Sequence, residues 1–317
     1  MNLVFLGTGG SIPTDARNHP SILVEHQGWQ VMMDCGEATQ IQLGRAGAGM
    51  NKRMAILITH LHADHVLGLP GILLRFSLLG RTRPLDIYGP PALLEFVKAG
   101  QATIHLGTTF ESTVYAIEGG YTTKLGELEM RAFEVVHRGF ALGYELTQQR
   151  PTGQFIPEKA ENLGVQRGPL WKTLSSGIAV TLEDGRVIKP EDVTGPKPAP
   201  VKIVYSGDTR PCDMLRKAAA SADLLICEAM YASEHKDLAE ERGHMTGIEA
   251  AQIAVEAHAK CLVITHLSPR YDMHRGSPVL DEAQAVFPNT LLARDLMRLR
   301  VDSKGVRTVS SDDARPE

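Results

Sequence analysis

Short apolar runs recur along the chain, and most of them end in a polar cluster. The runs that read as β-strands are 3–6, 21–24, 31–33, 55–59, 85–88, 127–136, 141–146, 202–205, 224–227 and 262–265. Helical periodicity, with apolar residues three or four positions apart, appears at 92–98, 213–220, 247–257 and 279–286. This alternation of strands and helices favours an α/β fold in which β-sheets carry helices on their outer faces.

The helix expected at 247–257 has a clear start signal. Thr246 stands directly before it, and Glu249 follows three residues later. This spacing is that of a capping box, in which each side chain binds the other residue's backbone N–H. We therefore expect the helix to begin at Gly247.

One long segment, residues 148–195, interrupts the pattern. It is rich in Gly, Pro and charged residues, and its apolar side chains, such as Phe155, Leu163, Leu170 and Trp171, are scattered. These are too few and too irregular to predict a core, so we expect a protruding arm inserted into a single domain, 1–317. Long inserts of this kind are often functional.

Composition indicates a globular protein of the cytoplasm. Of 317 residues, 43% are hydrophobic and 22% charged, which is near the average for soluble proteins. No apolar run reaches the length of a membrane span, so no membrane association is expected. The N-terminus resembles no secretory signal, and the four cysteines are far apart and expected to be reduced. The net charge of −4 gives no bulk attraction to nucleic acid, although a local basic patch could still bind RNA.

The strongest chemical signal is the segment Thr59-His60-Leu61-His62-Ala63-Asp64-His65, which directly follows an apolar strand. Imidazole and carboxylate ligands suit Zn²⁺, Mn²⁺ or Fe²⁺. The alternative is a polar loop with surface histidines. Three imidazoles and a carboxylate within six residues, placed at a strand end, favour a metal site.

Three further residues occupy the same kind of position. His137, Asp208 and His266 each follow an apolar strand. Alone, each would more often be a turn residue. Together with the histidine segment they make seven possible ligands, and seven ligands with one shared carboxylate fit a pair of metal ions.

The pattern T-H-x-H-x-D-H, followed by His, Asp and His, resembles the ligand signature of the metallo-β-lactamase superfamily. That resemblance implies a four-layer αββα sandwich with two metal ions, expected to be zinc, with Mn²⁺ or Fe²⁺ as alternatives. The implied ligands are His60, His62 and His137 for one ion, Asp64, His65 and His266 for the other, and Asp208 as the bridge. Asp34 matches a carboxylate that braces the histidine segment.

Other segments resemble the ribonuclease Z family of tRNA 3′-endonucleases. His244-Met245-Thr246 resembles its H-S-T segment, whose histidine is paired with an acidic residue that matches Glu228. The segment 265–271 resembles T-H-x-S-x-R-Y and implies that Arg270 binds phosphate. The segment 13–18 resembles P-x-K-x-R-N, with Arg17 and Asn18 present but Asp15 in place of the lysine.

The insert resembles the arm with which that family grips tRNA. Gly168 and Pro169 match its G-P motif, and Lys172 follows closely. The resemblance therefore adds Gly168, Pro169 and Lys172 to the substrate-binding residues. It also implies a homodimer, because members of the family are commonly dimers.

The implied function is a zinc-dependent endoribonuclease that removes 3′ trailers from precursor tRNA. Metal-activated water would attack the phosphodiester, Asp64 would act as general base, and His244, held by Glu228, would protonate the departing ribose oxygen. The tRNA would keep a 3′-hydroxyl.

Three alternatives remain open. The first is a small-molecule phosphodiesterase or another ester hydrolase of the same superfamily, which would leave the arm and Arg270 without a purpose. The second is a di-iron redox protein, in which a carboxylate usually replaces a histidine ligand, so His62 and His65 argue against it. The third is a non-catalytic RNA-binding protein, which would have no need of seven ligand positions.

Overall fold

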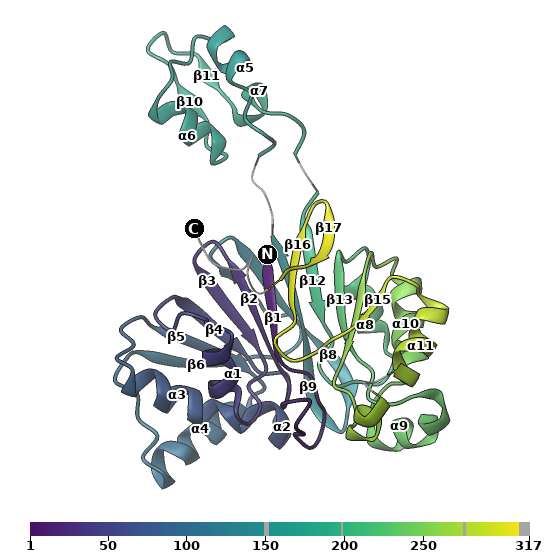
Figure 1. Ribbon diagram of the computed structural model, residues 1–317. Helices are drawn as coiled ribbons and strands as arrows, with labels where there is room; N and C mark the ends of the chain where they lie inside the picture. Colours follow the sequence, from purple (N-terminus) through teal and green to yellow (C-terminus); the bar gives the residue numbers. More distant parts are fainter. Residues whose placement is uncertain (149–151, 198, 275–276, 311–317) are drawn as a thin grey trace. The chain divides into compact units, whose positions relative to one another are not determined.

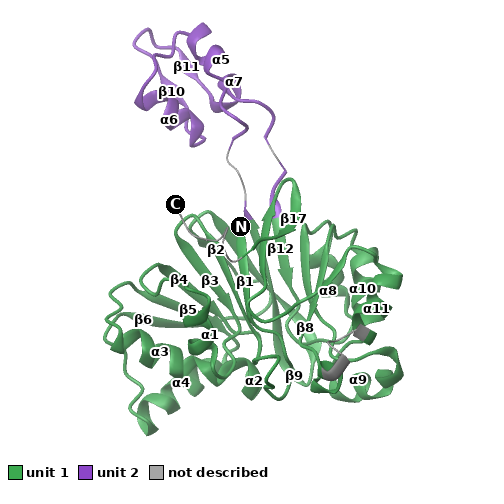
Figure 2. Ribbon diagram, viewed as in Figure 1, with its two compact units in different colours: residues 1–147, 202–317 green, residues 148–201 purple. Residues whose placement is uncertain are grey.

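The computed structural model describes residues 1–148, 152–197, 199–274 and 277–310. The chain forms two compact units, which Figure 2 distinguishes by colour. Unit 1 comprises residues 1–147 and 202–317, and unit 2 spans Gln148–Val201. Across the described residues, none of the helices has the length and apolar character that crossing a membrane requires.

Two large β-sheets form the centre of unit 1. The first has the strand order β17-β16-β1-β2-β3-β4-β5-β6, and the second has the order β15-β14-β13-β12-β9-β8-β7. The strands of the first are β1 Asn2–Gly7, β2 Ser21–His26, β3 Trp29–Met33, β4 Arg53–Leu57, β5 Leu85–Gly89, β6 Ser112–Ala116, β16 Arg298–Asp302 and β17 Gly305–Thr308. Those of the second are β7 Thr122–Leu125, β8 Leu128–His137, β9 Gly139–Gln148, β12 Val201–Tyr205, β13 Leu224–Glu228, β14 Leu262–Thr265 and β15 Thr290–Leu292.

Helices cover the outer faces of both sheets. Figure 1 shows α1, α3 and α4 on the outer side of the first sheet and α8, α10 and α11 on the outer side of the second. The helices of unit 1 are α1 Thr39–Arg45, α2 Ala63–Val66, α3 Gly68–Leu78, α4 Ala92–Thr103, α8 Asp213–Ala219, α9 Lys236–Arg242, α10 Gly247–Glu256 and α11 Ser277–Val286, with short 3₁₀ turns at Ser233–His235 and Pro269–His274. The expected four-layer αββα sandwich is thereby confirmed.

Both faces of the sheets are buried, as a sandwich requires. Along β1, Val4 and Leu6 pack in one apolar cluster with Phe76 of α3. Leu3 and Phe5 are also buried. Because successive strand residues point to opposite faces, these two point toward the interior between the sheets. A second cluster joins the other sheet to its own helices.

The strands and helices expected from apolar periodicity are present, with boundaries that differ by a few residues. The capping box of α10 is formed, with the Thr246 hydroxyl accepting from the Glu249 N–H and the Glu249 carboxylate accepting from the Thr246 N–H. In unit 1, periodicity missed the helices α1, α2, α3 and α9, the strands β6, β7 and β15, and the hairpin of β16 and β17. The helices α1 and α9 have only seven residues each, too few to show a clear repeat.

Unit 2 corrects one expectation. It contains α5 Pro157–Asn162, α6 Pro169–Ser175, α7 Pro190–Val193 and a hairpin of β10 Val180–Thr181 and β11 Val187–Ile188. The prediction that this segment cannot form a core was wrong. Its core residues are Ala160, Val165, Leu174, Val180, Ile188 and Val193, with Phe155, Leu163, Leu170, Trp171 and Leu182 packed against them. Apolar residues spread over several very short elements show no regular spacing, yet they converge once the elements fold.

Candidate active site

Strand ends bring the predicted ligands together. β4 leads into His60 and His62, β8 ends at His137, β12 leads to Asp208, and β14 leads to His266. Strands β3 to β6 run parallel to one another, and so do β12 to β15. The side chains that follow the carboxyl ends of such strands meet at one edge, where sites of α/β proteins are commonly found.

The backbone at this edge adopts unusual conformations. Gly207, directly before Asp208, has φ +60°, and a Cβ there would lie 2.9 Å from the Leu142 carbonyl oxygen. His266 itself has φ 59°, although it is not glycine. A Cβ on Gly10 would come within 2.6 Å of the His266 ring, so only glycine fits beside that imidazole. Strained conformations of this kind persist where the surrounding structure holds them, often at functional sites.

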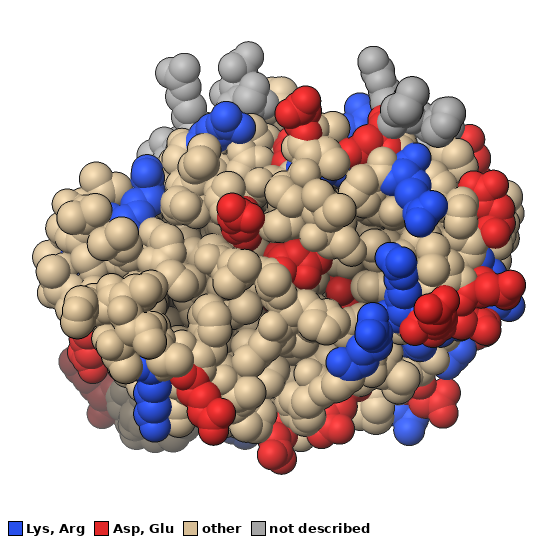
Figure 3. Space-filling view, turned by 90° about the horizontal axis from the view of Figure 1, so that it is seen from below, with Lys and Arg blue, Asp and Glu red and all other residues tan. Residues whose placement is uncertain are grey.

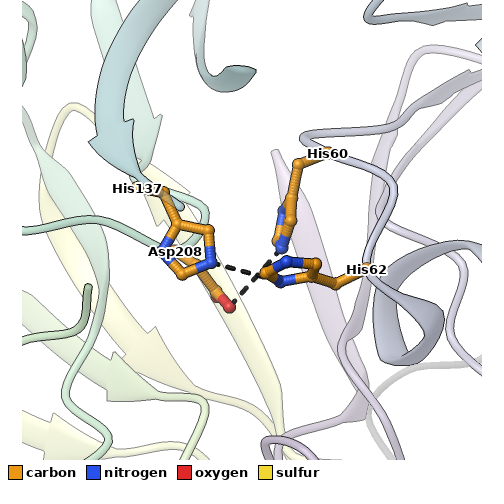
Figure 4. A group of neighbouring side chains, drawn as sticks. All are labelled: His60, His62, His137 and Asp208. Carbon is orange, nitrogen blue, oxygen red and sulfur yellow. Dashed lines mark hydrogen bonds and ion pairs between the residues drawn. The ribbon is translucent and has the colours of Figure 1, made fainter. Parts of the chain in front are cut away.

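The first group of possible ligands consists of His60, His62, His137 and Asp208. Figure 4 shows these four side chains pointing toward one another from different parts of the fold. His137 Nε2 lies 3.2 Å from His62 Nδ1, and His60 Nε2 lies 3.7 Å from Asp208 Oδ2. The other ring nitrogen of His137 faces the Gly243 carbonyl oxygen at 2.8 Å, which fixes the orientation of that imidazole.

The second group consists of Asp64, His65 and His266. His266 Nε2 lies 3.2 Å from His65 Nε2 and 3.4 Å from Asp64 Oδ2. Asp208 Oδ2 lies 3.2 Å from His65 Nε2 and 3.3 Å from His266 Nε2, so this carboxylate borders both groups. The Ser11 N–H donates to Asp64 Oδ2 at 2.8 Å and orients it.

These donor sets fit divalent metal ions. Within each group the possible ligand atoms all lie within 4.8 Å of one another. His60 Nε2 and Asp208 Oδ1 are buried without a hydrogen-bond partner among the described residues, which is costly for polar atoms unless a ligand binds them. Imidazole nitrogens that face each other at 3.2 Å also need a cation or a proton between them. The side chains are therefore arranged to bind divalent metal.

Charge is strongly coupled within the site. Burial opposes the negative charge of Asp208, but the facing imidazoles of His266 and His65 hold the pKa of this carboxyl well below its usual range. Burial likewise opposes a positive charge on His65, and Asp208 together with Asp34 raises the pKa of that imidazole. An anionic carboxylate among histidines is the state that favours metal binding.

Asp34 braces the histidine segment, as the family resemblance implies. Its side chain is fully buried. It accepts from the Thr59 N–H at 2.8 Å, the Thr59 hydroxyl at 2.9 Å and the Tyr205 hydroxyl at 2.8 Å, and it lies 2.8 Å from His65 Nδ1. Asp34 thus leaves His65 Nε2 to face the metal-binding group.

His244 and Glu228 form a buried pair beside the two groups. His244 Nδ1 lies 2.9 Å from Glu228 Oε1, and Glu228 also accepts from the backbone N–H of Thr209 and of Met245. Burial alone would lower the pKa of His244, but the charge and hydrogen bond of Glu228 raise it to about 9. The His244 ring centroid lies 5.1 Å from that of His137 and 5.3 Å from that of His266, so this imidazole adjoins both groups of possible ligands.

The residues expected to bind phosphate in unit 1 differ in their availability. Arg270 is exposed and, within the described ranges, pairs with no carboxylate. Arg17 is buried and is not a free cation. Its guanidinium donates to Thr8 and to the Ala293 carbonyl, both at 2.7 Å, and forms an ion pair with Asp272 at 3.4 Å. The Asn18 amide donates to the Glu37 carbonyl at 2.9 Å. Arg17 and Asn18 therefore hold the loop at 13–18 in place.

The three expected substrate residues of the insert lie in unit 2. Gly168 and Pro169 start α6, and Lys172 lies within it. All three are exposed on that unit. Trp171 donates to the Val165 carbonyl at 3.0 Å, so the same helix is anchored to the unit's core.

Several residues that hold the site's side chains in place belong to no motif that the sequence reveals. Thr59, Ser11 and Gly243 act through backbone or hydroxyl groups, which every turn possesses. Tyr205 ends an apolar strand and reads as a core residue, yet its hydroxyl binds Asp34. Only the fold brings these groups to the site.

A pocket of about 450 Å³ opens next to the first ligand group. Its lining includes His60 and His62 together with Leu61, Pro90, Phe140 and Arg138. Figure 3 shows the face of unit 1 on which α2 lies in Figure 1, with acidic side chains in a recess near the centre. Lys and Arg side chains gather to one side of this recess.

The chain is similar to known proteins over nearly its whole length. A protein named ribonuclease Z from Methanosarcina mazei is 40% identical over 302 residues, which are 95% of this chain and 98% of the relative. Ribonuclease Z from Gemmatimonas aurantiaca is 41% identical over 297 residues, or 92% and 93% of the two chains. A family model described as Anti-Pycsar protein Apyc1 matches residues 1–139.

Two solved structures agree with the fold. The crystal structure of the short form of human tRNase Z superimposes with a TM-score of 0.68 at 25% identity and covers 95% of this chain and 100% of that one. The metallo-beta-lactamase fold protein YhfI from Bacillus subtilis gives a TM-score of 0.67 at 19% identity, with 94% and 98% covered.

Proposed function

Because this chain belongs to the ribonuclease Z family, a family of hydrolases, we propose that it is a zinc-dependent endoribonuclease that removes 3′ trailers from precursor tRNA. The observation that carries the proposal is the combination of two adjoining metal-binding groups with the His244–Glu228 pair. Free thiols at all four cysteines agree with activity in the reducing cytoplasm.

The ligand assignment follows the two groups. His60, His62 and His137 would hold one zinc ion, Asp64, His65 and His266 the other, and Asp208 would bridge them. Bound divalent cations supply Lewis acidity, which activates water and offsets negative charge on phosphate oxygens. Mn²⁺ and Fe²⁺ suit the same nitrogen and oxygen donors, so metal analysis of the purified protein decides between them.

The chain's own residues complete the reaction. Asp64 would accept the proton of the attacking water, and its position is set by the Ser11 N–H. His244 would donate a proton from Nε2 to the departing ribose oxygen, because Glu228 holds its other nitrogen and favours the imidazolium. Phosphate would stay on the trailer, and the tRNA would keep a 3′-hydroxyl. Arg270, exposed beside the His266 segment, would contact substrate phosphate.

Unit 2 is proposed to bind the tRNA itself. The support is that it has its own core, so it can present a defined surface, and that Gly168, Pro169 and Lys172 are exposed on it. Contacts to phosphate position a nucleic acid without reading its sequence, which suits an enzyme that acts on many tRNAs.

A homodimer is the proposed assembly. Leu67, which directly precedes α3, and Leu74 and Leu78 within it are 49%, 53% and 78% exposed. Ile41 of the adjacent α1 is 52% exposed. In Figure 3 the side of unit 1 where α3 and α4 lie carries few charged residues. An exposed apolar stripe of this kind commonly marks a contact surface, and a second copy of the chain would cover it symmetrically.

The test is to incubate the purified protein with a 3′-extended precursor tRNA and to map both product ends. We expect a tRNA that ends in a 3′-hydroxyl and a trailer that begins with a 5′-phosphate. Asp64→Ala should abolish this cleavage while the fold is retained. Rapid turnover of a small nitrophenyl phosphodiester with the precursor left intact would instead establish a small-molecule phosphodiesterase.

A further inference from the structure

The pocket beside His60 and His62 has the chemistry of a base-binding site. Its volume of about 450 Å³ lies within the range of roughly 300–1,000 Å³ that small-molecule sites occupy. Pro90 and Pro91 contribute apolar wall, and Phe140 is 43% exposed, so its ring is open to a ligand. An exposed aromatic face next to a nucleic-acid cleavage site is suited to stacking on a base.

Two polar side chains complete the lining. Arg138 and Glu118 are both exposed, and within the described part of the chain neither is paired with a charged side chain. A guanidinium and a carboxylate can each hydrogen-bond to the edge of a base, while the apolar wall holds its faces. Apolar surroundings with a few polar groups are typical of sites for small aromatic ligands.

The position of the pocket indicates which nucleotide enters it. The ring centroids run from His244 to His137 at 5.1 Å and from His137 to His62 at 4.9 Å. His62 lines the pocket, whereas His244 does not. The pocket therefore adjoins His60 and His62, whereas the His244 ring adjoins His137 and His266.

Given the function proposed above, on which this step rests, His244 marks the tRNA side of the cleaved bond, because it protonates the ribose oxygen that leaves with the tRNA. We infer that the pocket binds the base of the first trailer nucleotide, stacked on Phe140 against Pro90 and Pro91. Phe140 is then a specificity-determining residue for the nucleotide that follows the cleavage position.

The experiment compares three precursor tRNAs: one intact, one abasic at the first trailer nucleotide, and one abasic at the last retained tRNA nucleotide. Each is cleaved by wild-type protein and by the variants Phe140→Ala, Phe140→Tyr and Ile104→Ala. Ile104 is the matched control, because it is 63% exposed at the end of α4 and does not line the pocket. Thermal unfolding of each variant checks that the fold is kept.

On the intact precursor, Phe140→Ala should lower kcat/KM about tenfold or more, as expected for one lost base stack, while Phe140→Tyr and Ile104→Ala stay near wild type. On the trailer-abasic precursor, wild type should show the same loss, and Phe140→Ala should add nothing to it. Equal losses for Phe140→Ala on the intact and trailer-abasic precursors would overturn the inference. The inference would also be overturned if the loss of kcat/KM in Phe140→Ala disappeared only on the precursor that is abasic at the last tRNA nucleotide. If wild type cleaves no precursor at all, the proposed function fails first and this inference fails with it.

Discussion

Two histidines of the site have one ring nitrogen held by a buried carboxylate. Asp34 holds His65, and Glu228 holds His244. Such a partner fixes the tautomer and the orientation of the ring, so that the opposite nitrogen faces the reaction. The two histidines differ in their neighbours, because His65 forms a possible metal-binding group with Asp64 and His266, whereas His244 forms a further possible group with Asp208 and His266.

Replacing His244 distinguishes a proton donor from a metal ligand. His244→Ala should leave bound metal unchanged and slow cleavage of precursor tRNA by about 10²–10⁴-fold, the usual contribution of a general acid. Single-turnover kinetics and metal analysis on the same preparation give both quantities. A loss of metal in this variant would reassign His244 as a ligand.

Removing the charge of Asp34 should weaken metal binding. Asn tolerates the left-handed backbone of this position, φ 58°, so Asp34→Asn should fold. It loses the carboxylate that faces His65, and metal affinity should fall about 10–100-fold, measured by competition with a chelator. Tyr205→Phe removes a single hydrogen bond to Asp34 and should change metal affinity less than tenfold. Equal effects of the two substitutions would mean that the charge of Asp34 does not matter.

At the scale of elements, short pieces of regular structure position the chemistry. Strand β13 ends at Glu228, and His244 lies near the end of the segment that leads from β13 to α10. The start of α10 is held by the capping box of Thr246 and Glu249, and Arg210 forms an ion pair with Glu249 at 2.9 Å. A helix start that is fixed on both sides keeps His244, two residues before the cap Thr246, in place.

The cap of α10 can be tested directly. Thr246→Ala should lower the free energy of unfolding by about 1 kcal/mol, because the Glu249 N–H loses its side-chain partner. Thr246→Ser keeps a hydroxyl and should cost much less. Urea unfolding of the three proteins measures both values, and equal stability of Ala and Ser would refute the cap's contribution.

Unit 2 is an element in its own right, because it has a separate core. The strands that lead into and out of it, β9 and β12, are neighbours in one sheet, so a short Gly-Ser linker can replace residues 148–201. Excision should raise KM for precursor tRNA strongly and make binding less dependent on salt, since phosphate contacts are lost. Hydrolysis of a small phosphodiester should survive. Unchanged cleavage of precursor tRNA would exclude unit 2 as the tRNA-binding arm.

For the whole molecule, the apolar stripe on α3 determines the expected assembly. Wild-type protein should sediment as a dimer at micromolar concentration, and Leu74→Glu with Leu78→Glu should shift it to a monomer, because a charge cannot be buried unpaired at the contact. Val255→Glu, at an exposed apolar position of α10 on the other sheet, is the control. A monomer in the wild type would refute the dimer.

Local pattern alone was enough to predict much of this protein. Apolar runs and helical spacing depend on neighbours in the chain, so they predicted β-sheets with helices on their outer faces, the helix that Thr246 caps and the placement of the ligands after strands. The four-layer sandwich itself was expected only from the family resemblance. His60, His62 and His65 could be identified because their density at one strand end is itself a chemical signal. Their distant partners, such as His266, became convincing only through the family resemblance.

Long-range packing decided the rest. Tyr205 donates a hydrogen bond to Asp34, which is 171 positions away in the sequence. The residues near either of them give no sign of this contact. Arg17 matches a phosphate-binding motif, yet partners 9 and 276 residues away bury its guanidinium. The core of unit 2 and the pocket at Phe140 arise in the same way, from side chains that are scattered in sequence. Burial and hydrogen-bond partners are properties of the folded neighbourhood, and residues distant in the chain supply most of it.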